Sequence, residues 1–392
     1  MEITPISKSD ALAKFCEEQE RADYIAVDTE FLRDRTYWPQ LCLVQIAGPD
    51  AAAAIDTLAP EIDLTPLYDL MSNRDLLKVF HAGRQDVEIF FHRTGSIPEP
   101  LFDSQVAAMV CGFGDQVGYE ALIAKLVGAR IDKSSRFTDW SNRPLTQKQL
   151  KYALADVTHL RPAYEKLADY LEESGRTRWL DQEMDVLMSP ETYRLDPETA
   201  WRRIKSRNKN RRFHAILCEL AAWREREAQT RNVPRNRVLR DDAILEITAQ
   251  APENTDDLKR MRAIPKSYVN GDRAADILAA VSRGKEIPEA DLPRLERPAQ
   301  RPTKIGPVSD LLKVLLKHVT ETHNVAPRLI ASADDLDRIA ADDNANVPAL
   351  QGWRRELFGE QALALKAGRV ALTAKGSQTK VISIGETAGD KG

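Results

Sequence analysis

Two acidic residues follow an apolar segment near the start of the chain. In the stretch YIAVDTEF, Asp28 and Glu30 come directly after residues 24–27. Residues two apart on a strand project from the same face, so this segment would deliver two carboxylates to one point. A buried strand carries paired acids where a cation compensates their charge. The motif indicates a metal site, and taken alone it leaves open an ordinary solvated strand end.

A third acid begins a predicted helix. In LLKVFHAGRQDVEIF (76–90), an apolar strand at 76–80 leads through Ala82 and Gly83 into a helix whose first turn holds Asp86. The alternative is that Asp86 only charges a helix N-terminus, which acids often do because the helix dipole favours them there.

A tyrosine and a fourth acid share one helical face. In LKYALADVTHL (150–160), Tyr152 and Asp156 are four residues apart and therefore one turn apart on a helix. Leu150, Ala153 and Val157 indicate that this helix packs against a core. The alternative for this motif alone is a simple Tyr–Asp contact.

Gathered at one place, these four acids would form a site for hard cations. Carboxylate oxygens suit Mg²⁺ or Mn²⁺ and do not suit zinc. Clustered carboxylates repel one another unless a cation is present. Two ions about 3.5–4 Å apart can activate a water and stabilise the leaving oxygen of a phosphodiester. Tyr152 is then placed to orient the attacking water.

The first 200 residues predict a mixed α/β domain that would position these side chains. Candidate strands lie at 24–28, 41–47, 52–56 and 76–80, and candidate helices at 85–92, 103–111, 118–127 and 147–172. We expect Pro162 to kink or end the first part of the last helix. Asp103 is expected to cap a helix rather than to bind metal.

The second half of the chain predicts two helical domains and no strand for well over a hundred residues. A basic linker at 201–212 precedes the first (213–290), and a proline-rich linker at 291–304 precedes the second (305–375). A shift of 92 residues places TRNV (230–233) on THNV (322–325), which indicates a tandem duplication. Resemblance between any two capped helical hairpins is the alternative. Residues 376–392 are expected to form a flexible tail.

The charge along the chain is uneven. The net charge is −4, yet residues 202–240 hold thirteen Lys or Arg against three acids. Such a local excess indicates a polyanionic partner, and a solvated linker is the alternative. The basic residues expected to contact nucleic acid are Arg202, Arg203, Lys205, Arg207, Lys209, Arg211 and Arg212.

Composition excludes several classes of protein. No stretch approaches the 18–20 apolar residues of a membrane span, and the first ten residues are not expected to be a secretory signal. The four cysteines lack Cys-x-x-Cys spacing, so neither a disulfide framework nor a zinc site is expected. A cytoplasmic location is therefore expected. GFGDQVG (112–118) lacks the spacing of a dinucleotide site.

The motifs together resemble the ribonuclease D family of the DEDD exonuclease superfamily. VDTEF is similar to the family's first motif, HAGRQD to the second and YALADV to the third, and 132–146 resembles the segment before the third. Tyr152, four residues before the last acid, indicates the tyrosine subclass. The two helical blocks resemble HRDC modules, which bind nucleic acid or help to position it, and the second does so more weakly.

The resemblance implies a ribonuclease H-like exonuclease domain followed by two all-α HRDC-like domains. It implies a metal-dependent 3′→5′ exoribonuclease that releases nucleoside 5′-monophosphates, with tRNA precursors as substrates. Its catalytic residues would be Asp28, Glu30, Asp86, Tyr152 and Asp156, and the four acids would bind two Mg²⁺ or Mn²⁺ ions. No obligate protein partner is evident. A DNA-directed exonuclease and a catalytically inactive nucleic-acid-binding protein remain as alternatives.

Overall fold

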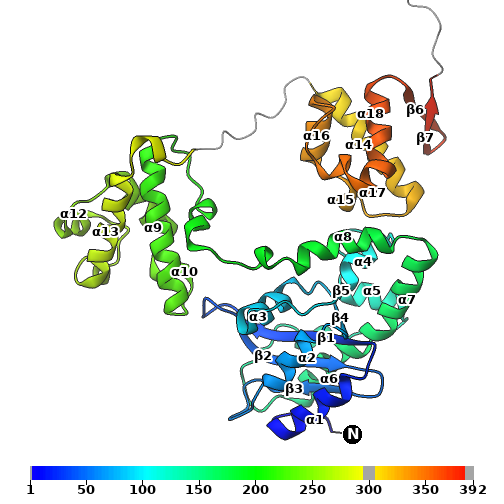
Figure 1. Ribbon diagram of the computed structural model, residues 1–392, viewed down its shortest axis with the longest axis horizontal. Coiled ribbons are helices and arrows are strands. Elements are labelled where there is room, and N and C mark those ends of the chain that lie inside the picture. Colours follow the sequence, from blue (N-terminus) through cyan, green and yellow to red (C-terminus); the bar gives the residue numbers. More distant parts are fainter. Residues whose placement is uncertain (1, 295–304, 385–392) are drawn as a thin grey trace, which may run out of the picture.

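A five-stranded mixed sheet forms the centre of the N-terminal domain in the computed structural model, which describes residues 2–294 and 305–384 (Figure 1). Its strands are β1 (Tyr24–Leu32), β2 (Gln40–Ala47), β3 (Ala52–Ile55), β4 (Leu77–Phe80) and β5 (Leu101–Asp103), in the order β3-β2-β1-β4-β5. β1 runs antiparallel to β2 and parallel to β4. β1 therefore lies in the middle of the sheet, where its apolar residues are buried.

The helices of this domain include those that the sequence predicted, with shifted ends, and three that it did not predict, at 9–19, 65–72 and 177–188. The helices are α1 (Ser9–Gln19), α2 (Thr65–Ser72), α3 (Arg84–Thr94), α4 (Ser104–Val110), α5 (Tyr119–Leu126), α6 (Gln147–Thr158), α7 (Leu160–Glu173) and α8 (Thr177–Met188). The helix expected over 147–172 is two helices that meet at His159. Pro162 explains the break, because its ring would clash with the carbonyl of Thr158, the last residue of α6.

Two features of the sheet differ from the sequence prediction. β1 continues to Leu32 instead of ending at residue 28, so both acids lie within the strand and not after it. The register of the β1–β2 pair shifts between Glu30 and Phe31. β5 was not predicted, because three residues are too few to show a strand's alternation.

The first helical domain begins two residues earlier than expected. It contains α9 (Arg211–Thr230), α10 (Arg235–Val238), α11 (Asp241–Gln250), α12 (Thr255–Arg260) and α13 (Asp272–Glu286). Asn210 caps α9 by accepting hydrogen bonds from the backbone N–H groups of Arg212 and Phe213. Arg211 and Arg212 therefore belong to the helix and not to the linker. The first residues of the expected linker, 201–203, belong to the 3₁₀ helix η3 (Pro197–Arg203).

The second helical domain repeats part of the first. It contains α14 (Gly306–His323), α15 (Pro327–Ile330), α16 (Ala333–Ala341), α17 (Gly352–Arg354) and α18 (Glu360–Lys366), with a π-helical turn, η7 (Arg355–Gly359), before α18. α10 and α15 begin 92 residues apart, and so do α11 and α16. The spacing seen in the sequence is thus also the spacing of these helices.

The expectation of a flexible tail from residue 376 is wrong over its first part. β6 (Val370–Lys375) and β7 (Gln378–Ser383) pair as an antiparallel hairpin, joined by a turn at Gly376 whose φ of 63° suits glycine. The hairpin packs against α18 and α14. The rest of the expected tail, and most of the proline-rich linker, lie outside the described residues.

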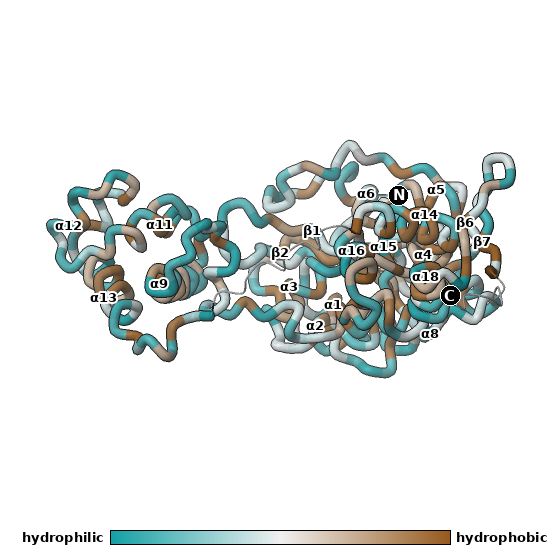
Figure 2. The backbone as a smooth tube through the Cα atoms, turned by 90° about the horizontal axis from the view of Figure 1, so that it is seen from above, coloured by the Kyte–Doolittle hydropathy of each residue, from teal (hydrophilic) through white to brown (hydrophobic). Residues whose placement is uncertain are grey.

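The second helical domain shares a hydrophobic core with the N-terminal domain. The rings of Trp179 in α8 and Trp353 in α17 stack with centroids 4.6 Å apart, and Arg354 pairs with Glu183 beside them. The Ala326 N–H donates to the carbonyl of Met109 at 3.0 Å. One cluster of buried side chains therefore runs from the sheet into α14–α18. Figure 2 shows these helices lying over the N-terminal domain, with α9–α13 to one side.

The first helical domain meets the N-terminal domain through the β1–β2 loop. Tyr37, in that loop, is buried in the core of α9–α13, and its hydroxyl donates to Glu225. The fully buried Glu225 carboxylate also accepts from Arg235 at 2.5 and 2.6 Å and from Arg203 at 3.2 Å. Burial would raise the pKa of Glu225, but these donors overcome it and hold the pKa below its usual value.

Replacing Glu225 by glutamine should destabilise the protein by about 3 kcal/mol at pH 7, because it leaves half-buried arginines without their counter-charge. A carboxyl whose folded pKa is depressed stabilises the fold above its unfolded pKa, and the gain disappears as the pH falls through the folded value. Urea unfolding at pH 7 and at pH 3 measures this. Glu198→Gln, which removes an exposed pair with Arg226, is the control. Equal losses in both variants, or a loss that persists at pH 3, would contradict the assignment.

Within the described part of the chain, no helix has both the length and the apolar character needed to cross a membrane.

Candidate active site

Strand β1 and helix α6 bring three acids together. Asp28 and Glu30 lie on the central strand, and Asp156 lies on α6, which packs across β1, β2 and β3. Each of the three offers a carboxylate oxygen, and these oxygens all lie within 4.8 Å of one another. Residues about 125 positions apart in sequence thus meet in a group that can hold a metal ion.

The N-terminus of α6 is fixed by a capping box. The Thr146 hydroxyl accepts from the backbone N–H of Gln149, and the Gln149 side chain accepts from the backbone N–H of Thr146. Further along, the Tyr119 hydroxyl donates to the carbonyl of Ala155 at 3.0 Å. These bonds orient the helical face that presents Tyr152 and Asp156 to the strand.

Asp86 lies beside this group and outside it. It sits in the first turn of α3, where its side chain is 7% exposed, and it accepts a hydrogen bond from the Thr29 hydroxyl. Thr29 lies between the two acids of β1. Apart from that position, nothing in the sequence indicated that its hydroxyl would bond to Asp86. The negative charge of Asp86 nevertheless raises the pKa of Glu30. The structure therefore gathers three of the four expected acids closely and places the fourth next to them.

The electrostatics of the group call for a cation. Burial, followed by the charges of Asp28, Asp156 and Asp86, raises the pKa of Glu30 to about 10. Burial also raises the pKa of Asp156 to about 7, against the opposing effects of Tyr152 and Arg136. The pKa values of Asp28 and Asp86 are raised by burial and by neighbouring carboxylates. A divalent cation would supply positive charge that favours the ionised form of these carboxyls. Their oxygens are the ligands that Mg²⁺ and Mn²⁺ prefer.

Tyr152 faces Asp156 from one turn earlier on α6. Burial, and then the nearby carboxylates, raise the pKa of its phenol. The hydroxyl therefore keeps its proton at neutral pH and can act as a hydrogen-bond donor and acceptor, but not as a base.

Asp103 supports the site without joining it. As expected, it caps a helix: its carboxylate accepts from the backbone N–H groups of Gln105 and Val106 at the start of α4. It also accepts from the N–H groups of Ala82 and Gly83, at 3.1 and 2.8 Å. These bonds hold the turn between β4 and α3 that carries Asp86.

The basic residues near 202–212 divide into two groups. Arg202, Arg203, Lys205, Arg207 and Lys209 are exposed. Arg211 donates to the carbonyl of Leu292 at 2.7 Å, and Arg212 donates to the carbonyls of Gly284, Lys285 and Ile287 at the end of α13. The last two arginines are thus committed to the fold of the first helical domain.

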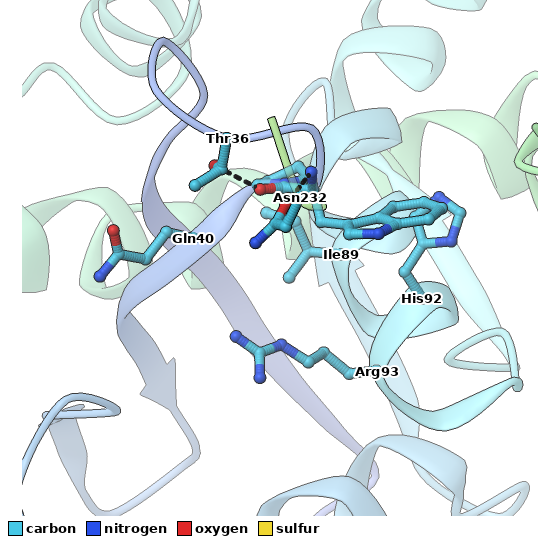
Figure 3. A pocket seen from close by; sticks show the side chains of 8 residues that line it. Thr36, Gln40, Ile89, His92, Arg93 and Asn232 are labelled. Atoms are coloured by element: carbon cyan, nitrogen blue, oxygen red, sulfur yellow. Dashed lines mark hydrogen bonds between the residues drawn. The ribbon is translucent and has the colours of Figure 1, made fainter. Parts of the chain in front are cut away.

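A pocket of about 370 Å³ lies where the β1–β2 loop, α3 and the first helical domain meet (Figure 3). The backbone N–H of Trp38 donates to the side-chain oxygen of Asn232 at 3.0 Å. The Trp38 ring packs on the His92 ring with centroids 4.4 Å apart. None of the four acids lines this pocket. It is a seam between domains and is separate from the acid group.

Comparison with known proteins identifies the family of the chain. Residues 3–172 match the family model described as 3'-5' exonuclease, and residues 213–281 match the HRDC domain. The chain is 51% identical to ribonuclease D of Granulibacter bethesdensis, with 97% of each chain covered. It is 52% identical to ribonuclease D of Nitrobacter hamburgensis, with 94% of this chain and 96% of that protein covered.

A solved structure shows the same fold over nearly the whole chain. The crystal structure of Escherichia coli RNase D, described as an exoribonuclease involved in structured RNA processing, superimposes with a TM-score of 0.78 at 31% identity. The match covers 94% of this chain and 99% of that chain. The chain therefore belongs to the ribonuclease D family of divalent-metal-dependent 3′–5′ exoribonucleases.

Proposed function

We propose that Asp28, Glu30, Asp86, Tyr152 and Asp156 form the catalytic site, and that it removes nucleotides from RNA 3′ ends as nucleoside 5′-monophosphates. The observation that carries this proposal is the convergence of three carboxylates within 4.8 Å, with Asp86 beside them. Two Mg²⁺ or Mn²⁺ ions would supply an activated water and neutralise the leaving oxygen of the phosphodiester.

The residues of the proposed site have separate roles. Asp28, Glu30 and Asp156 would hold one ion, and Asp86 would help to hold the second near Asp28. Tyr152 would orient the attacking water through its protonated hydroxyl. Asp103 and the Thr146–Gln149 capping box would position the two helices that carry these residues.

We infer that RNA is held by groups outside the catalytic centre. The exposed residues Arg202, Lys205, Arg207 and Lys209 would attract phosphates next to an otherwise acidic chain, whereas Arg203 is paired with Glu225. The division into a catalytic domain at 1–200 and helical domains after it is supported by the two family matches. We assign the second helical domain as a second HRDC module, because α15 and α16 repeat the spacing of α10 and α11.

We propose tRNA precursors as substrates, in line with structured RNA processing by the Escherichia coli relative. We also propose a cytoplasmic location, which the four free cysteines support.

Digestion of a 5′-labelled RNA tests the activity and its direction, and chromatography of the released nucleotides against nucleoside 5′-monophosphate standards tests the product. With Mg²⁺ or Mn²⁺, the full chain should shorten the RNA one nucleotide at a time from the 3′ end, and EDTA should stop the reaction. A DNA of the same sequence is the matched control, and it should be degraded more slowly. Internal fragments, or cleavage in EDTA, would contradict the proposal, and equal rates on DNA would favour a DNA-directed exonuclease.

A further inference from the structure

A tight turn projects from the segment just before α6. Ser135 at its start is 2% exposed, and its carbonyl accepts from the Thr138 hydroxyl at 2.8 Å and from the Thr138 N–H at 3.2 Å. The Gln149 side chain in turn donates to the Thr138 hydroxyl at 3.2 Å. Both ends of the turn are therefore fixed, and one end is tied to the helix that carries Tyr152 and Asp156.

The two residues at the centre of this turn are held out from the fold. Phe137 is 91% exposed, whereas Val186, the next most exposed large apolar side chain among the described residues, is 59% exposed. The Arg136 guanidinium lies 5.2 Å from the centroid of the Phe137 ring. The ring thus presents its face to solvent, beside a guanidinium, on a turn that is anchored at both ends.

The turn also lies close to the acid group. The Gln149–Thr138 hydrogen bond ties the turn to α6, the helix that carries Tyr152 and Asp156. Trp140, three residues further on, packs near Tyr152 with ring centroids 6.2 Å apart. Among the residues that the structure describes, Arg136 forms no ion pair within 4.0 Å, so its donors remain available to a phosphate.

We propose that Arg136 and Phe137 form a clamp for the 3′-terminal nucleotide, in which the Phe137 ring stacks on the base and Arg136 binds the phosphate of the bond to be cut. This inference rests on the proposed function and adds the residues that would position its substrate. Stacking accepts every base because each has a π-face, and an arginine next to buried acids balances the charge of the incoming phosphate.

Kinetics on paired substrates test the clamp in the full chain. One substrate is a short RNA, and the other is the same RNA whose 3′-terminal nucleotide lacks its base. Phe137→Ala should lower kcat/KM on the normal RNA by about tenfold, mainly through KM, because stacking of one base is worth roughly that factor or more. The same variant should match the wild type on the abasic RNA. Phe137→Trp should keep the activity.

Arg136→Ala should lower kcat/KM by at least about tenfold on both RNAs, since it loses a charged contact to phosphate, and Arg136→Lys should recover part of the loss. Val186→Ala, on α8, removes an exposed apolar side chain elsewhere and should leave kcat/KM on both RNAs unchanged.

The outcomes separate the clamp from the proposed function. If Phe137→Ala has no effect, or affects the abasic and normal RNAs equally, the clamp is overturned while the exonuclease stands. If the wild type degrades no RNA, the proposed function fails. In that case, fluorescence anisotropy measures binding of the two labelled RNAs to the wild type and to Phe137→Ala. The clamp requires that the wild type binds the normal RNA more tightly than the abasic RNA, and that Phe137→Ala binds both equally.

Discussion

Replacing Asp28 by asparagine should abolish RNA cleavage, with a fall in kcat of at least about 1,000-fold. The amide keeps the shape of the side chain but removes a charge that lies within 4.8 Å of Glu30 and Asp156 oxygens. Metal ions stabilise a phosphodiester transition state by several kcal/mol, and each 1.4 kcal/mol corresponds to a factor of ten in rate. Single-turnover digestion of the labelled RNA at saturating protein measures the effect on chemistry alone.

The same variant should fold at least as stably as the wild type when no metal is added. Burial and repulsion from Asp156 raise the pKa of Asp28, so the charged carboxylate costs folding free energy at neutral pH. The melting temperature in EDTA should therefore be equal or higher for Asp28→Asn. Asp169→Asn, an exposed acid on α7, controls for the loss of one negative charge and should keep full activity. Wild-type activity in Asp28→Asn, or its unfolding in EDTA, would exclude the site.

Adding Mg²⁺ or Mn²⁺ at about 100 times its dissociation constant should stabilise the protein by about 2.7 kcal/mol, because only the folded chain assembles the acid group. The gain should shrink as the pH falls from 8 to 6. Metal ligands must be deprotonated, and the pKa of Asp156 is raised to about 7 and that of Glu30 to about 10. Protons thus compete with the metal over this range.

Thermal unfolding with metal titrations at pH 6, 7 and 8 measures this linkage. The apparent affinity should rise with pH, and Asp28→Asn should lose most of the metal-induced gain. The Asp169→Asn variant should respond to metal as the wild type does. A gain that is independent of pH, or one that survives in Asp28→Asn, would place the bound metal somewhere other than at these carboxylates.

Local signals in the sequence were sufficient for much of the fold. The apolar runs predicted four of the five strands of the sheet, and the helical spacing predicted α3–α5 to within a few residues and the start of α6. The capping character of Asp103 was also predicted, because a short acid before an apolar run is a local signal. β5 was missed because three residues carry no period, and the β6–β7 hairpin because its polar residues suggested a tail.

The sequence also contained the types and spacing of the acids, and hence the preference for a hard divalent cation. It did not contain the distances between them. Asp28 and Asp156 become neighbours only because α6 crosses the strands of the sheet, and Asp86, beside the group, accepts a hydrogen bond from the hydroxyl of Thr29. Long-range packing sets such contacts, and no pattern within a few residues encodes them.

The tertiary structure alone decided which charged and apolar residues remain free to bind RNA. Arg211 and Arg212 looked like the other linker residues but are bonded to carbonyls of their own domain, whereas Phe137, an ordinary phenylalanine in the sequence, stands exposed beside Arg136. The second helical domain looked like a separate module, yet its core continues into that of the catalytic domain. Whether a side chain is buried, paired or free depends on segments distant in the chain, so residue type and spacing could determine the chemistry available but not where it is exposed.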